Sequence, residues 1–382
     1  MSYDLYIENP QGDAATQLRL LVTNDAPLSD YLLLTHGELD KKTKQPRRGT
    51  FNQDIAKELE RLESLGLKKP SLTNLAALPP GSWFLQFTFT LAKSWMSKDD
   101  DPFYVTESVN PVRKDKVFKV PIMSASSWKG LLRWTIMHTR LALKKDLLTP
   151  EEFARERFVQ TLLFGNEKGE EPGETKDFAA FLDALKPNAR GEYERLLRAY
   201  YELESNDPLP HHSGRLMSYP TFFNLIDVEI INPHSRKTRA GTHPIYLECV
   251  PQGAHGTFSL LYVPFDLIGK ETEIRRQPLE DLQLVSKGLR AMFLTYGFSA
   301  KRTSGYGVAE KTVSGGLVQI RIEETQKWWE REGKVMASQP PAEAKPEKPQ
   351  APEPTWLKRE FDSFAKLSEI AETLLKEQGG AQ

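Results

Sequence analysis

The clearest pattern of hydrophobic and polar positions lies between residues 82 and 91, in the stretch SWFLQFTFTL. Five apolar residues alternate there with polar ones: Trp83, Leu85, Phe87, Phe89 and Leu91. A period of two places all five side chains on one face of an extended chain. The pattern therefore predicts a strand with one face toward the core.

Three other stretches carry apolar residues at helical spacing, at 52–67, 124–143 and 279–296. In the second, Trp128, Leu132 and Ile136 share a face with Leu131 and Thr135, and Ser126 or Ser127 is expected to cap its start. In the third, Gly297 is expected to end the helix. The spacing predicts three amphipathic helices.

Further strand-like runs follow the second helix, and two more follow the third. They are residues 221–231, 244–250, 257–265, 305–313 and 317–324. The order is strand, helix, several strands, helix and strand. This order predicts an α+β fold with a ferredoxin-like (RRM-like) core and insertions.

The ends of the chain differ from this core in composition. Residues 1–80 are interpreted as an N-terminal extension, 81–325 as the ferredoxin-like domain, and 326–355 as a charged, proline-rich linker. Residues 356–378 are predicted to be an amphipathic helix, with an apolar stripe of Leu357, Phe361, Phe364, Leu367, Ala371 and Leu374. A helix on a linker must dock, either on this chain or on a partner.

The charge balance and the cysteine count limit the expected partners and the expected cellular compartment. The net charge is −1, with 51 basic and 52 acidic residues, so any contact with nucleic acid must come from local patches. The one cysteine, Cys249, cannot form an internal disulfide, which indicates a reducing, cytoplasmic setting. No signal peptide and no membrane span are expected, and therefore no membrane partner.

The stretch SASSWKG (124–130) begins the second predicted helix. A helix start exposes free N–H groups and a partial positive charge. Ser126, Ser127 and Lys129 add donors there, which suits a phosphate group. An ordinary serine cap beside a surface lysine is the alternative interpretation.

The glycine-rich stretch GFSAKRTSGYG (297–307) follows the third helix. It lacks the order of a P-loop or of a dinucleotide-binding turn. It presents two cations together with hydroxyls and flexible backbone, in Lys301, Arg302, Ser304, Gly305 and Gly307. The alternative is a plain connection between a helix and a strand.

A ferredoxin-like fold would bring these two stretches near one another, because each lies at the end of a helix that flanks the same sheet. We therefore predict one site formed by both. Other cations that would widen it are Arg133, Arg113, Lys114, Lys116 and Lys119.

Two other groups raise the question of catalysis. Asp99, Asp100 and Asp101 follow the first strand and form either a solvated turn or a Mg²⁺ site that activates water or a ribose hydroxyl. His211 and His212 lie in a Pro- and Gly-rich loop, and a loop histidine is a candidate general base for RNA cleavage. No cofactor is expected otherwise.

Several of these stretches resemble the RAMP superfamily of CRISPR systems. PIMSASSWKGLLRW (121–134) resembles its first-helix motif, and GFSAKRTSGYG resembles its C-terminal glycine-rich loop. LFG (163–165) resembles its short Phe-Gly turn, and GRLMSYPTFF (214–223) resembles its Gly-Arg-Leu entry to a strand. DVEIINPH (227–234), together with 244–262, is similar to the Cmr-type subunit that closes one end of the type III-B complex.

The resemblance implies a ferredoxin-like, RNA-binding subunit of a type III CRISPR effector that acts in antiviral defence. It would hold guide RNA (crRNA), and possibly target RNA, beside other effector subunits. The residues it implies for backbone contacts are Ser126, Ser127, Lys129, Arg133, Lys301, Arg302, Ser304, Gly305 and Gly307. The sequence departs from the family's motifs at two positions. Met123 replaces a glycine before the serines, and Ser299 replaces the second glycine of the loop. The alternative is an endoribonuclease subunit that cuts target RNA with Mg²⁺ at Asp99–Asp101.

Overall fold

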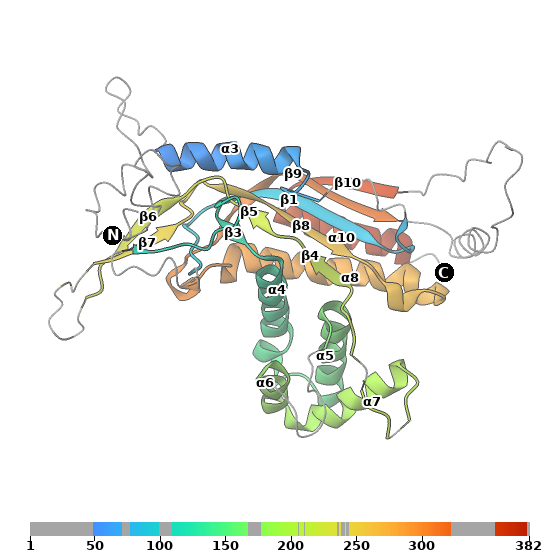
Figure 1. Cartoon of the computed structure of the whole chain (residues 1–382). Coiled ribbons are helices and arrows are strands. Elements are labelled where there is room, and N and C mark those ends of the chain that lie inside the picture. The colour runs from blue at the N-terminus through green and yellow to red at the C-terminus, as the bar shows by residue number, and fades with distance from the viewer. Residues whose placement is uncertain are drawn as a thin grey trace, which may run out of the picture.

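An antiparallel sheet lies at the centre of the computed structural model (Figure 1). The structure describes residues 49–70, 77–98, 109–166, 177–204, 206–209, 211–234, 237, 241, 244–321 and 356–379. Its helices are α3 (Thr50–Ser64), α4 (Ala125–Arg140), η3 (Ala142–Lys144), α5 (Pro150–Phe164), α6 (Asp177–Leu185), η4 (Pro187–Ala189), α7 (Arg190–Tyr200), η5 (Phe265–Leu267), α8 (Glu271–Ala291), η6 (Met292–Tyr296), η7 (Arg302–Ser304) and α10 (Phe364–Gly379). Its strands are β1 (Trp83–Leu91), β2 (Val109–Asn110), β3 (Ile122–Met123), β4 (Leu216–Ser218), β5 (Thr221–Phe222), β6 (Asp227–Ile231), β7 (Ile245–Cys249), β8 (His255–Tyr262), β9 (Ala309–Arg321) and β10 (Trp356–Ser363).

The order of the strands in the central sheet is β10-β9-β1-β8-β4, and all neighbours are antiparallel. Without β10, this is the order of a ferredoxin-like sheet, in which α4 connects the first strand, β1, to the second, β4, and α8 connects the third, β8, to the fourth, β9. The α+β, ferredoxin-like prediction is confirmed.

The alternating residues of β1 face the helices and form the middle of the core. Trp83, Leu85, Phe87, Phe89 and Leu91 are all fully buried. Figure 1 shows α4, α8 and α10 on one side of the sheet and α3 on the other. The predicted strand and the three predicted amphipathic helices are therefore present, although α8 begins at Glu271, eight residues earlier than expected.

Two strand predictions near the glycine-rich loop are wrong. Residues 305–313 and 317–324 were expected to be separate strands, but β9 runs unbroken from Ala309 to Arg321. Gly315, at φ 58°, lies in a bulge of that strand rather than in a turn. Residues 221–231 are likewise not one strand, since β5 and β6 are separated by a short loop.

The C-terminal segment belongs to the core of this chain. Residues 356–363, predicted to begin a helix, form strand β10 instead, which pairs with the free edge of β9. Only from Phe364 does the chain become helical, and α10 then packs on α8, with Lys287 and Glu372 3.3 Å apart. The apolar stripe is buried through Phe361, Phe364, Leu367, Ala371 and Leu374.

The segment between α4 and β4 forms a helical lobe below the sheet (Figure 1). α5, α6 and α7 enclose a second core with the end of α4, centred on Met137, Phe153 and Tyr193. Thr149 and Glu152 form a capping box at the start of α5. Helix α3 is tied to the rest through Asn52, which exchanges two hydrogen bonds of 2.8 and 3.0 Å with the backbone of Ile226.

Candidate functional site

The start of α4 and the loop after α8 line one pocket of about 390 Å³. The first contributes Ser124, Ser127, Gly130, Leu131 and Trp134, and the second contributes Phe298, Ser299, Ala300 and Arg302. The chain after β1 (95–97), together with Arg113, Ile122 and Met123, completes the lining. The structure thus brings together the two stretches that sequence analysis placed in one site.

Three serine hydroxyls meet at the start of α4. Ser124 is the cap, because it is the last extended residue and its Oγ accepts a hydrogen bond of 3.2 Å from the backbone N–H of Ser127. The prediction that Ser126 or Ser127 caps the helix is therefore wrong. The Ser124 Oγ lies 2.8 Å from that of Ser127 and 3.0 Å from that of Ser126, which is exposed. The hydroxyls gather beside the free N–H groups of the first turn.

The two cations predicted on α4 lie outside the pocket lining. Lys129 is half-buried, and both this burial and the neighbouring Arg133 lower its pKa from the ordinary value. The Arg133 guanidinium lies over the ring of Phe178 in the helical lobe, 4.1 Å from its centroid. Arg133 therefore connects α4 to α6 rather than facing the pocket.

The glycine-rich loop is held by its own backbone and by Ser299. Gly297, at φ 73°, ends the helix as predicted, and the N–H of Phe298 donates to the carbonyl of Gly307 at 2.8 Å. Ser299 Oγ accepts from the N–H of Met96 at 2.7 Å and donates to its carbonyl at 3.0 Å. The serine that replaces the expected glycine thus ties the loop to the chain after β1.

The two predicted glycines have different surroundings. Gly307 is buried at φ 67°, and a Cβ there would lie 2.3 Å from the Cβ of Ser299, so only glycine fits. Gly305, at φ 81°, is exposed, with open space where a Cβ would be. Ser304 and Lys301 are also exposed, and Lys301 adopts the left-handed conformation at φ 57°. These three residues therefore form a surface next to the pocket.

Arg302 connects the loop to α4 directly. Its guanidinium lies over the ring of Trp134, 4.4 Å from the centroid. Trp134 in turn stacks on His138, with ring centroids 4.9 Å apart and planes at 7°, and meets the ring of Tyr296 edge-on. Among the described residues, Arg302 Nη1 is buried and has no hydrogen-bond partner. Sequence analysis did not single out Trp134, although an aromatic residue beside a predicted cation site is a usable signal.

Arg113 and Lys114, two of the cations predicted at 113–119, differ in their surroundings. Arg113 is exposed and lines the pocket, whereas Lys114 is buried in an ion pair with Glu248. Glu248 also accepts a hydrogen bond of 2.9 Å from the N–H of Val112. Lys114 therefore anchors this segment to β7, and the prediction that it widens a basic surface is wrong.

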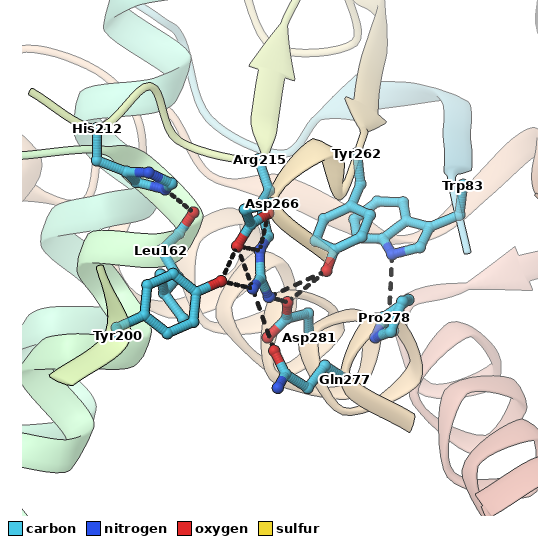
Figure 2. A network of polar contacts seen from close by, with 10 residues as sticks. All are labelled: Trp83, Leu162, Tyr200, His212, Arg215, Tyr262, Asp266, Gln277, Pro278 and Asp281. Atoms are coloured by element: carbon cyan, nitrogen blue, oxygen red, sulfur yellow. Dashed lines mark hydrogen bonds and ion pairs between the residues drawn. The ribbon is translucent and has the colours of Figure 1, made fainter. Parts of the chain in front are cut away.

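The LFG and GRL stretches pack against each other and have a structural role. A Cβ on Gly214 would lie 2.3 Å from the carbonyl carbon of Phe164, and the N–H of Arg215 donates to the carbonyl of Leu162 at 3.0 Å. The Arg215 side chain then enters a buried network (Figure 2). Its partners are Asp266 at 2.6 Å, Asp281 at 2.9 Å, Gln277 at 3.1 Å, Tyr262 at 3.3 Å and Tyr200 at 3.4 Å.

The pKa values of the two carboxylates in this network shift in opposite directions. Burial would raise the pKa of Asp266, but hydrogen bonds from Arg215 hold it below the ordinary value. Burial raises the pKa of Asp281, in spite of the opposing charge of Arg215. The network joins the lobe, β4 and α8 and leaves no side chain facing the pocket.

His212 is part of the packing around this network. Its ring Nε2 lies 3.3 Å from the carbonyl oxygen of Leu162, and its backbone N–H donates to Asn166 Oδ1 at 2.7 Å. Burial lowers its pKa. The ring is thus held against the backbone of α5, and a general-base role on RNA stays a prediction for His212. His211 is exposed beside it.

Asp99, Asp100 and Asp101 lie outside the described residues, so the predicted Mg²⁺ endoribonuclease site stays a prediction. The described part of the chain holds no cluster of three or more His, Cys, Asp or Glu residues that could bind a metal. None of the helices in the described ranges is both long enough and apolar enough to cross a bilayer.

Comparisons with known proteins add a family and several solved structures. The family model of the RAMP superfamily matches residues 102–310, more than half of the chain. A chain of the type III-B Cmr-beta complex bound to cognate target RNA is 11% identical, with a TM-score of 0.36 over 82% of this chain and 95% of that chain. A chain of the type III-A Csm3-Csm4 subcomplex is 11% identical (TM-score 0.34, 78% and 97%), and Cmr6 from Pyrococcus furiosus is 15% identical (TM-score 0.28, 60% and 98%). None of the curated proteins matches this chain.

Proposed function

The chain belongs to the RAMP superfamily, and from this premise we propose that it is an RNA-binding subunit of a type III CRISPR ribonucleoprotein. It holds the backbone of the guide RNA at the pocket between α4 and the loop after α8, and it packs against neighbouring subunits. Its resemblance to the Cmr-type end-capping subunit favours a position at one end of such a complex.

One observation carries this proposal: the two stretches that resemble the superfamily's first-helix and glycine-loop motifs meet at a single pocket. Sequence alone leaves each stretch open to an ordinary structural interpretation. Together they gather hydroxyls, helix N–H groups and the Arg302 guanidinium within one surface. These are the groups that contact phosphates and ribose in protein–RNA interfaces.

The chemistry of the surface favours the backbone of RNA over a particular base sequence. Lys301 and Ser304 are exposed next to the pocket, and Arg113 and Arg302 line it. Such donors contact any phosphate equally. A guide RNA varies in sequence from one spacer to the next, so a backbone contact suits it.

Substitution of the loop cations tests the proposal. Arg302→Ala and Lys301→Ala in the full-length chain are each expected to weaken binding of unrelated RNA sequences by about tenfold, since each removes one charge-assisted contact. Each should also reduce the salt dependence of binding by roughly 0.7 in slope on a single strand. Affinities measured across a salt titration check both expectations.

Arg276→Ala is the matched control, because Arg276 is exposed near the opposite end of α8 and pairs only with its neighbour Glu280 within the described residues. It should leave affinity and slope unchanged. Equal affinity and slope for the wild type and for both loop variants would refute the proposed site.

A further inference from the structure

The pocket between α4 and the loop is larger and more apolar than a phosphate site requires. Its volume of about 390 Å³ falls in the range of roughly 300–1,000 Å³ that is typical of pockets for small organic groups. Its lining includes the nearly fully buried side chains of Trp95, Met123 and Phe298, together with Ile122 and Leu131. Trp95, Met123 and Phe298 belong to the core, whereas Ile122 and Leu131 are only partly buried. A phosphate gains nothing from these two side chains, but a ligand with apolar faces would bury them further from water.

Polar groups in the lining accompany this apolar surface. Ser124, Ser127 and Arg113 come from segments next to the first turn of α4 or within it. Their hydroxyls, the free helix N–H groups and the guanidinium suit a phosphate or a ribose hydroxyl. The lining thus combines a surface for a charged backbone with a surface for a flat apolar group.

Arg302 offers that flat group a stacking surface. One face of its guanidinium rests on Trp134 at 4.4 Å, and Trp134 is itself held by His138 and Tyr296. The contact fixes the plane of the guanidinium before any ligand binds. In the part of the chain that the structure describes, Nη1 of Arg302 is a buried donor that still lacks an acceptor. Bases of single-stranded RNA stack on such planes and carry acceptors on their edges.

We propose that this pocket takes one unstacked nucleobase of the bound RNA, with the adjoining phosphate beside Ser124, Ser127 and Arg113. Arg302 stacks on the base or donates to its edge, and Trp134 is the positioning residue that holds Arg302. The inference rests on the proposed function and adds a ligand class to it, because phosphate contacts alone would leave the exposed parts of Ile122 and Leu131 uncovered.

The test uses the full-length chain and a base-free ribose-phosphate oligomer, with or without a single adenine. If the pocket takes a base, one adenine should tighten binding roughly tenfold, while a second adds less than about twofold. The oligomer can slide until its base reaches the pocket, so its register need not be known.

Arg302→Met keeps the aliphatic stem and removes the guanidinium plane. In this variant the gain from the adenine should fall below about twofold, and Trp134→Leu should reduce the gain in the same direction. Equal binding of base-free and one-base oligomers by the wild type would overturn the nucleobase pocket. Salt-dependent binding of the base-free oligomer would meanwhile still support the proposed backbone contact, so the two failures are distinguishable.

A free nucleotide is the other source of the same chemistry. Adenosine 5′-monophosphate should fail to displace the one-base oligomer at equal concentration, because it lacks the neighbouring phosphates. Displacement at equal concentration would show a site for free nucleotides and would overturn the proposal.

Discussion

Arg215→Ala is expected to lower the free energy of unfolding by about 3–5 kcal/mol, the cost of breaking a buried ion pair from one side. The Arg215 side chain is 2% exposed and contacts two carboxylates, two tyrosine hydroxyls and an amide. Without it, buried Asp281 and half-buried Asp266 would lose the cation that they share. Urea denaturation of the full-length chain, followed by circular dichroism, measures the change.

Arg276→Ala is again the control, because it removes an exposed arginine from the same helix that carries Asp281. Exposed pairs contribute about 0–1 kcal/mol, so this variant should unfold close to the wild type. A loss below about 1 kcal/mol for Arg215→Ala would contradict the structural role assigned to the GRL stretch.

Phe364→Ala is expected to lower the free energy of unfolding by about 3–5 kcal/mol, the usual effect of truncating a fully buried aromatic residue. Phe364 is fully buried where β10 turns into α10. Its ring stacks on Phe293 of η6 at 5.1 Å and meets Phe87 of β1 edge-on at 5.3 Å. The residue thus joins the C-terminal segment to the middle of the sheet.

Phe181→Ala provides the comparison, since the Phe181 side chain is 45% exposed on the helical lobe. Phe181→Ala should lower the free energy of unfolding by no more than about 1 kcal/mol. If Phe364→Ala unfolded no more easily than Phe181→Ala, the C-terminal segment would not be part of the core, and docking on a partner would explain its apolar stripe better.

The central strand and the ferredoxin-like order could be predicted because both are local patterns. The alternation in β1 and the helical spacing in α4 and α8 are visible within single stretches of sequence. β10 could not be predicted in this way. Its apolar residues Leu357 and Phe361 also fit a helical stripe that continues through Phe364, and only pairing with the edge of β9 makes the segment extended.

The candidate site was predictable as a pair of stretches and not as a set of contacts. Ser127 and Arg302 line the pocket as expected, whereas Arg133 turns to the lobe. Lys114 differs from its neighbours because Glu248, far away in the sequence, lies opposite it. The stack of Arg302 on Trp134 likewise depends on how α8 is placed against α4. Packing between segments that are distant in the sequence determines the contacts of these side chains.

Photo-crosslinking tests the central claim most directly. An assembled complex that contains the full-length chain and a guide RNA with 4-thiouridine along its length would be irradiated, and the crosslinked peptides identified by mass spectrometry. The proposed function predicts crosslinks within residues 121–134 and 297–307, and fewer of them in the Arg302→Ala variant. Crosslinks confined to other parts of the chain, or none to this subunit at all, would contradict it.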